Sequence, residues 1–316
     1  MAFKMYFKNK TINGKKYLYA VRSIRLPNGK VKTLERRFKG EKKKEIEGIL
    51  EKMLVKEHLS YMLKNFKIDS IFTKEQFKKI EQIRADYAKI LRKLPKNSFK
   101  DLLDRFTANF TYESNALEGN SLTLKDVAIV MFENASIRGK DLREIYETRN
   151  SRKIVEMIFK GKFKLTHDAI IKMHKMLVKE VGINTGYKKF PNFIVGKKVK
   201  ITPPEKVHKE MEHLLNWIRE NPDRLHPIKL AALFHGKFET IHPFEDGNGR
   251  VGRFLINVIL IQNKYPPLII RKSQRISYLS ALEKFDSRHP DTLERFLLER
   301  FKDTFKKFFE IYVKYV

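Results

Sequence analysis

The feature that most limits the fold is helical periodicity, which runs through most of the 316-residue chain. From Glu41 onward apolar residues recur every three or four positions, as at Ile46, Leu50 and Met53. Residues with special backbone preferences interrupt the pattern at Gly119, Gly139, Gly161, Gly182 and Pro227. The spacing predicts a mainly α-helical protein made of many short and medium helices.

Two segments depart from the helical pattern. The first 40 residues contain KKYLYAVRSIRL, which alternates as a strand does, then the turn PNGK and the returning run VKTLERRF. In YKKFPNFIVGKKVKIT, residues 187–202, two short runs flank Gly196-Lys197 and predict a hairpin. We therefore expect a small basic antiparallel sheet over residues 1–40, a helical region over 41–97, and a helical domain over 98–316 with an inserted β-hairpin.

Composition narrows the class of protein. The chain has no cysteine, which excludes disulfides, thiolate catalysis and cysteine-ligated zinc, and fits a reducing compartment. We see neither a signal peptide nor an apolar run long enough to span a membrane. The expectation is a soluble cytoplasmic protein with no membrane partner. Its 24 phenylalanines against one tryptophan predict a core packed with phenylalanine.

The charge balance points to anionic partners. Lys and Arg number 67 against 37 Asp and Glu, a net charge of +30. Such a field attracts nucleic acids, nucleotides and acidic protein surfaces. A lysine-rich surface serving only solubility or heat tolerance is an equally good explanation of the total.

The most informative stretch is IHPFEDGNGRVGR, residues 241–253. Glycines at 247, 249 and 252 let the backbone approach a ligand and point N–H groups at it, and a helix beginning near Gly249 adds its positive end. Arg250, Arg253 and Asn257 share one face of that helix. A concave set of amides with two guanidiniums is suited to a polyphosphate.

Two residues of this stretch supply chemistry. His242 precedes the glycines, where a neutral imidazole could take a proton from an incoming hydroxyl, and Asp246 is an oxygen ligand suited to Mg²⁺. For any one residue a plain alternative is preferable, such as a core histidine beside a glycine-rich loop. The whole set at this spacing favours phosphoryl or nucleotidyl transfer.

The string His-Pro-Phe-x-Asp-Gly-Asn-Gly-Arg-x-x-Arg, from His242 to Arg253, resembles the signature of the Fic family at every specified position. Residues 186–207 resemble that family's flap hairpin, and NVILIQNKYPPLII with Tyr278 resembles the last helices of its core. The resemblance spans roughly residues 100 to 300. It implies a helical Fic-type core with the hairpin as a flap.

The resemblance implies an activity, the transfer of AMP from ATP to a Ser, Thr or Tyr hydroxyl of a protein. Gly247 and Gly249 favour AMP transfer over the kinase-like branch of the family, which has bulkier residues there. The implied roles are a base at His242, a core anchor at Phe244, Mg²⁺ at Asp246, an anion hole at Gly247, Asn248 and Gly249, the β-phosphate at Arg250, the γ-phosphate at Arg253, adenosine at Asn257 and Tyr278, and docking of the target strand at Val195 and Val199.

A second motif lies upstream in SNALEGN, residues 114–120. Ser114 and Glu118 are one helical turn apart, and Gly119 is an ordinary helix end when taken alone. Beside a Fic core the motif resembles the family's inhibitory Ser/Thr-x-x-x-Glu-Gly/Asn sequence. The resemblance implies that Glu118 pairs with Arg253 at the γ-phosphate position and inhibits the enzyme within one chain, with removal of AMP as a further reaction.

A second class of function stays open, a nucleic-acid-binding regulator in which the basic sheet does the work and the Fic core is subsidiary. Residues 1–40 offer side chains for phosphate contact and base stacking at Tyr17, Tyr19, Arg22, Arg25, Arg36 and Arg37. The predicted partners are ATP, Mg²⁺ and a hydroxyl-bearing protein, with nucleic acid and a second copy of the chain left open.

Overall fold

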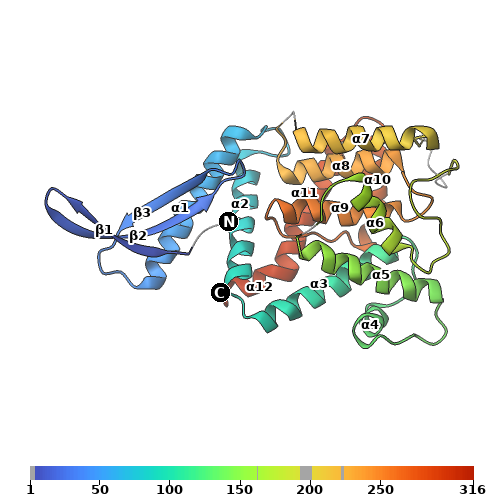
Figure 1. The fold of residues 1–316 in the computed structure, drawn as a ribbon, viewed down its shortest axis with the longest axis horizontal. Helices are drawn as coiled ribbons and strands as arrows, with labels where there is room; N and C mark the ends of the chain where they lie inside the picture. The colour runs from blue at the N-terminus through green and yellow to red at the C-terminus, as the bar shows by residue number, and fades with distance from the viewer. Residues whose placement is uncertain (1–3, 162, 193–200, 222–223) are drawn as a thin grey trace. The chain divides into compact units, whose positions relative to one another are not determined.

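The computed structural model describes residues 4–161, 163–192, 201–221 and 224–316, and the chain divides into two compact units, residues 1–92 and 93–316 (Figure 1). Most described residues are helical, and the strands form a small antiparallel sheet. The predicted mainly α fold with a small sheet near its start is confirmed. The finer division into 1–40, 41–97 and 98–316 stays a prediction.

The first unit begins with a three-stranded sheet in the order β1-β2-β3, with antiparallel pairing throughout. Asn13 and Gly14 join the first two strands in left-handed conformations, as a two-residue hairpin turn requires. The predicted PNGK turn joins the next pair, and the Leu26 N–H donates to the Lys30 carbonyl at 2.8 Å. The strands are β1 Tyr6–Ile12, β2 Lys15–Arg25 and β3 Val31–Arg37.

Helix α1 (Lys43–Asn65) packs on one face of this sheet. Their shared core consists of Ala20, Ile24 and Leu34 from the sheet and Ile46, Leu50 and Leu54 from the helix. Helix α2 (Lys74–Lys93) joins α1 through a buried contact of 3.3 Å between His58 Nε2 and Glu81 Oε2. The sheet therefore has its main apolar support in α1.

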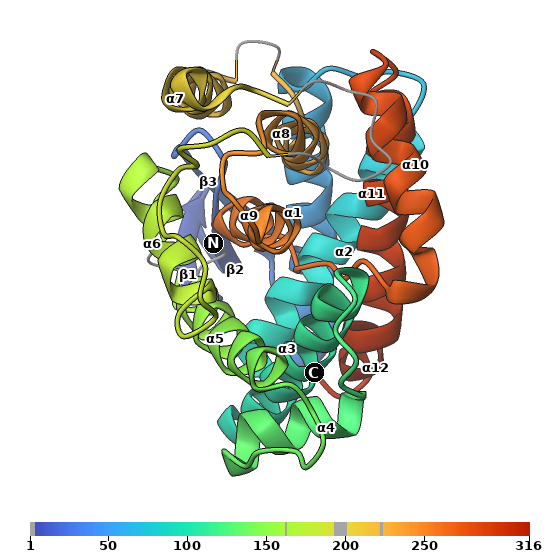
Figure 2. The same cartoon turned by 90° about the vertical axis from the view of Figure 1, so that its right-hand side faces the viewer.

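The second unit is a helical bundle built around α9 (Asn248–Gln262), whose side chains are almost all buried. Figure 2 shows α9 enclosed by α3, α5, α6 and α8, and close contacts join it to all four. Many of the largest fully buried side chains are phenylalanines, as predicted. The other helices are α3 Lys96–Leu117, α4 Leu124–Ala128, α5 Leu142–Phe159, α6 His167–Leu177, α7 Pro204–Glu220, α8 Pro227–Ile241, α10 Arg275–Asp286, α11 Asp291–Thr304 and α12 Glu310–Val313.

The predicted interruptions of the helical pattern all fall at helix ends or in the loops between helices. The four glycines that were expected to interrupt it all have positive φ, and Pro227 is the first residue of α8. The tip of the predicted hairpin, including Val195 and Val199, falls in residues 193–200 and lies outside the described residues. Among the described helices, none is both long and apolar enough to cross a membrane.

Candidate active site

The site is built on the loop between α8 and α9. Helix α8 ends at Ile241, and His242 takes a left-handed conformation with φ 50°, which is uncommon for a residue with a side chain. Its backbone N–H still donates to the Phe238 carbonyl at 2.9 Å, so the residue closes one helix while turning the chain. The strained backbone at the expected base is therefore held in place by α8.

The loop is braced from within by two motif residues. The Asn248 side chain accepts from the Phe244 N–H and donates to the Phe244 carbonyl, each at 2.8 Å. Phe244 is fully buried, as the expected core anchor should be. Asn248 is itself 2% exposed, so its amide fixes the shape of the loop in this structure. The side chain is therefore already bonded within the loop. A contribution of Asn248 to the anion hole stays a prediction, and it would come from the backbone N–H.

A histidine that the sequence did not single out lies under the same loop. The His174 ring, on α6, stacks on Phe244 with centroids 3.9 Å apart, and its Nε2 lies 3.0 Å from the Asp246 carbonyl. Because a carbonyl only accepts, Nε2 must be the protonated nitrogen. Burial lowers the pKa of His174 to about 4, which keeps the ring neutral near pH 7. It is thus a structural support.

The three glycines of the motif do different things. Gly247 precedes α9 with φ 82°, a conformation that strains other residues. A Cβ at Gly249 would lie 2.4 Å from Glu118 Oε1, so the Glu118 carboxylate occupies the space beside the start of the helix. A Cβ at Gly252 would meet Glu239 Oε1 at 2.7 Å. The expectation of ligand approach at Gly252 is therefore wrong, because α8 side chains fill that space.

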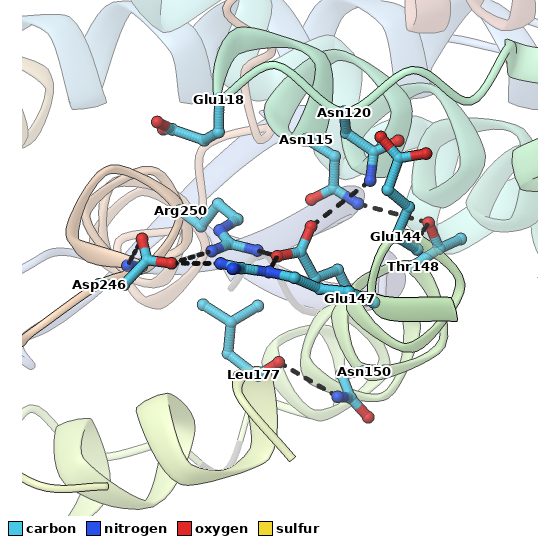
Figure 3. A network of polar contacts seen from close by, with 12 residues as sticks. Asn115, Glu118, Asn120, Glu144, Glu147, Thr148, Asn150, Leu177, Asp246 and Arg250 are labelled. Carbon is cyan, nitrogen blue, oxygen red and sulfur yellow. Dashed lines mark hydrogen bonds and ion pairs between the residues drawn. The ribbon is translucent and has the colours of Figure 1, made fainter. Parts of the chain in front are cut away.

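Arg250 belongs to a chain of four charged groups (Figure 3). Its side chain is 3% exposed, with Nη1 2.7 Å from Glu147 Oε1 and Nη2 3.5 Å from Asp246 Oδ2. Arg143 also reaches both acids, at 3.2 Å to Glu147 and 2.6 Å to Asp246. The expected Mg²⁺ ligand thus stands between two guanidiniums, while Glu147 holds the buried arginine in place.

Arg253 forms the predicted contacts with the upstream motif. Its Nε donates to Ser114 Oγ at 2.9 Å, and its Nη2 donates to the Ser114 carbonyl at 2.8 Å and to Glu118 Oε1 at 2.6 Å. Burial opposes the charge of Arg253, but Glu118 and Tyr278 together outweigh this effect and the net pKa of the guanidinium is raised. Gly119 follows with φ 99° and ends α3. The Glu118 side chain stays 42% exposed, so only one end of the pair is buried.

Side chains from α8 and α10 lie beside the expected base His242 and beside Arg253. Glu239, 7% exposed, lies 4.0 Å from the Nδ1 atoms of both His235 and His242. His235 is in the core, and its Nε2 lies 2.7 Å from the Tyr278 hydroxyl. Tyr278 also interacts with Arg253. Glu239 therefore lies on the Nδ1 side of the His242 ring, where it can orient the ring.

The remaining predicted contacts are placed as follows. Asn257 exchanges two hydrogen bonds with the Leu268 backbone, at 3.0 and 2.8 Å, which gives its amide a structural use. Its contact with adenosine, like that of buried Tyr278, stays a prediction. Before the undescribed hairpin tip, the Lys188 N–H donates to the Pro243 carbonyl and Asn192 donates to the Phe244 carbonyl, each at 2.9 Å. The chain leading to the flap is therefore fastened to the loop.

Sequence reasoning missed Arg143, Glu147, His174 and Glu239. None of them belongs to the motif, and the first two lie about a hundred residues upstream of their partners Asp246 and Arg250. One signal was available for Glu239, which stands three residues before His242 near the end of a helix and thus on the same side of it. The others carry no local signal in a single sequence.

The comparisons with known proteins agree with this geometry. Residues 164–260 match the model of the Fic/DOC family. Protein adenylyltransferase Fic of Nematostella vectensis is 32% identical over 179 residues, covering 55% of this chain and 42% of that protein. The Drosophila grimshawi protein of the same name is 34% identical over 178 residues, covering 54% and 36%. The chain thus spans less than half the length of these curated relatives.

Solved structures resemble the fold of most of the chain. A Fic-domain-containing signaling protein from Bacteroides thetaiotaomicron superposes with a TM-score of 0.66 and 27% identity, over 72% of this chain and 94% of that one. A fragment of Fic-1 from C. elegans gives a TM-score of 0.65 at 21% identity, over 74% and 70%. The second likeness supports the fold alone.

Proposed function

Since residues 164–260 form a domain of the Fic/DOC family, we propose that this chain is an autoinhibited protein AMP-transferase that moves AMP from ATP to a Ser, Thr or Tyr hydroxyl. One observation supports this best: the Glu118 carboxylate rests against Gly249 at the start of α9 and pairs with Arg253 at 2.6 Å. A carboxylate bound there stands where an anionic ligand of the same helix start would bind.

The site has the groups that a triphosphate needs. The N–H groups at the start of α9 face the space beside Gly249, and the helix dipole favours negative charge there. Arg250 and Arg253 add two fixed cations at 3% exposure each, and guanidiniums bind phosphate oxygens in pairs. Arg250 already has Glu147 as its partner, so it is positioned in advance. In this proposal Arg250 faces the β-phosphate and Arg253 the γ-phosphate.

The residues present also suit Mg²⁺. Asp246 offers a half-exposed carboxylate at the edge of the loop, and among the described residues there is no cluster of three ligands that would hold a metal alone. Mg²⁺ commonly binds through one or two carboxylates together with substrate phosphates. Asp246 would therefore hold the ion against the nucleotide, where it would neutralise phosphate charge. For this, Asp246 must give up part of its pairing with Arg143.

The reaction follows from the position of His242. The oxygen of the target hydroxyl bonds to the α-phosphorus of ATP, the bond from that phosphorus to the bridging oxygen breaks, and pyrophosphate leaves. His242 takes the hydroxyl proton as the new bond forms. Glu239 lies 4.0 Å from the His242 ring and is suited to stabilise it once protonated. The chain's other groups bind and orient, which is most of what phosphoryl chemistry requires.

Inhibition is the second part of the proposal. The γ-phosphate and Glu118 compete for one guanidinium, and Ser114 holds the Arg253 side chain from below through two hydrogen bonds. Because Glu118 is 42% exposed, its carboxylate can swing out into solvent, and the γ-phosphate would then compensate the buried charge of Arg253. If the same carboxylate positions a water, it also supports removal of AMP from a modified target. Both roles of Glu118 belong to this proposal.

The test uses purified full-length protein, a cell lysate and ATP labelled on either the α- or the γ-phosphorus. AMP transfer predicts that only the α label enters protein bands. His242→Ala should lower incorporation by about 10²- to 10⁴-fold, the usual cost of losing a positioned base, while ATP binding measured by calorimetry is retained. Entry of the γ label, or incorporation by His242→Ala within a few-fold of the unmodified protein, would overturn the proposal.

A further inference from the structure

The sheet of the first unit has one face covered by α1, and its opposite face carries mostly exposed or half-buried side chains, with Val21 fully buried among them. Along β2, inward side chains alternate with outward ones, and Ala20 and Ile24 point to α1. The register then places one set of residues on the other face, which we call the outer face. Its cations and their neighbouring rings are Lys8 and Lys10 from β1, Lys15, Tyr17, Tyr19 and Arg25 from β2, and Arg37 from β3, and it also carries the acid Glu35.

The cations of the inner face are neutralised by acids. Arg22, 4% exposed, has its Nη1 3.3 Å from Glu51, and Lys32 pairs with Glu57, both acids lying on α1. Arg36 lies 3.8 Å from Glu41. The prediction that Arg22 is available for phosphate contact is therefore wrong. The ion pairs of these three cations stabilise the sheet and its packing against the chain that follows it.

The outer face keeps its charge. Residues 1–40 contain twelve Lys and Arg against one acid, Glu35, which pairs with Lys10. Lys8, Lys15, Arg25 and Arg37 are exposed and make no ion pair among the described residues. The outer face therefore carries four exposed cations without an ion-pair partner among the described residues, beside the one paired cation Lys10.

The two tyrosines of the outer face support cations. The Arg37 guanidinium lies 3.9 Å from the centre of the Tyr17 ring, and the Lys10 ammonium lies 5.3 Å from that of Tyr19. Stacking on a ring limits the directions that a side chain can take while leaving its charge exposed. With their faces occupied, these rings are poorly placed to stack on the bases of a single strand. This favours phosphate contact over base stacking.

We propose that the outer face binds duplex DNA through its phosphates, giving the chain a nucleic-acid docking surface separate from its catalytic domain. The major groove of B-form DNA admits a two-stranded β-ribbon, and the β1–β2 hairpin, with Lys15 beside its turn, has that shape. The major groove of an RNA helix is too narrow for such a reader. The surface does not require the Fic domain to be inactive.

Fluorescence anisotropy of the full chain tests the proposal, with labelled 20-base-pair DNA, single-stranded DNA of the same sequence, duplex RNA and polyglutamate as probes. The test variant is Lys8→Gln/Lys15→Gln/Arg37→Gln. The matched control removes three exposed cations from the second unit, Lys125→Gln/Lys206→Gln/Lys209→Gln. Circular dichroism checks that both variants keep the native fold.

We expect duplex DNA to bind most tightly, with log affinity falling linearly against log salt. The test variant should lose about 10-fold or more at low salt and its slope should decrease by about 0.9 for each lost phosphate contact, while the control keeps both values. Equal losses in the two variants would overturn the proposal and show a general charge effect. Preference for single strands, duplex RNA or polyglutamate, or no binding at low salt, would also overturn it.

Discussion

At the scale of single residues, the same motif mixes groups placed for ligands with groups that shape the loop. Asp246 and the two arginines present charge, whereas Asn248 and Phe244 hold the loop in form. Gly252 belongs to the second kind, because the space beside it is filled by Glu239 and His235 from α8. A match to a string of residues therefore does not say which members face a ligand and which hold the loop. The contacts in the structure separate the two kinds.

Replacing this glycine tests the distinction. A Cβ in Gly252→Ala would lie 2.7 Å from Glu239 Oε1 and 2.8 Å from His235, both buried, so the packing must shift. We expect urea unfolding to show a loss of about 1–3 kcal/mol, typical of overpacking. Gly48→Ala in α1 is the matched control, since its Cβ would meet nothing within 4 Å and should stabilise α1 by up to about 1 kcal/mol. A neutral Gly252→Ala would contradict the packing explanation.

At the scale of elements, each helix around α9 gives the site one part. Helix α3 supplies Ser114 and ends at Glu118, α5 supplies Arg143 and Glu147, α6 supplies His174, and α8 leads into His242. The elements themselves follow from local sequence, and glycine and proline positions predicted where most of them end. Which helix faces which cannot be read from periodicity, so Arg143 and His174 could not be predicted.

Helix α5 offers a test of how Asp246 is held. Arg143→Ala removes a half-exposed partner 2.6 Å from the Asp246 carboxylate, which frees that oxygen for Mg²⁺. Exposed pairs contribute about 0.2–1 kcal/mol, so in a Glu118→Gly background half-maximal AMP transfer should need up to about fivefold less Mg²⁺. Arg152→Ala, on the same helix and paired with Glu156 at 2.9 Å, should leave the requirement unchanged. A higher requirement in Arg143→Ala would indicate that Arg143 binds the nucleotide.

Helix α6 makes stability depend on pH. Burial lowers the pKa of His174 to about 4 from its ordinary 6.5, so between these values the unfolded chain binds a proton that the folded chain does not. The contribution of His174 to the free energy of unfolding is fully present above about pH 6.5. It falls by about 3 kcal/mol in total as the pH drops toward 4. His174→Gln keeps a donor for the Asp246 carbonyl and removes the titration.

The measurement is urea unfolding at pH 7 and pH 5 without Mg²⁺. The difference in unfolding free energy between the two pH values should be smaller in His174→Gln than in the unmodified protein. His213→Gln is the control, because that ring is 58% exposed and should leave the difference as it was. An unchanged pH difference in His174→Gln would show that another group titrates.

At the scale of the whole molecule, the site joins segments far apart in the chain, with Glu118 and Arg253 separated by 135 positions. The motif at 242–253 was readable because it is contiguous, and the inhibitory motif because its form resembles one known beside such cores. Contacts formed only by folding, such as Glu147 with Arg250, leave no mark in a single sequence. For the same reason the sequence shows that the N-terminal segment is basic, but it does not show that acids on α1 pair with cations on one face of the sheet.

The central claim is that Glu118 keeps Arg253 from ATP, and AMP incorporation at equal protein concentration with Mg²⁺ tests it most directly. Glu118→Gly removes the carboxylate near a helix end, and Glu118→Gln keeps the side chain without its charge. Glu118→Gly/His242→Ala sets the background. We predict that both single variants incorporate more AMP than the unmodified protein, including into themselves, and bind ATP more tightly. Equal or lower incorporation by a folded Glu118→Gly protein would contradict the account and leave SNALEGN as a helix end.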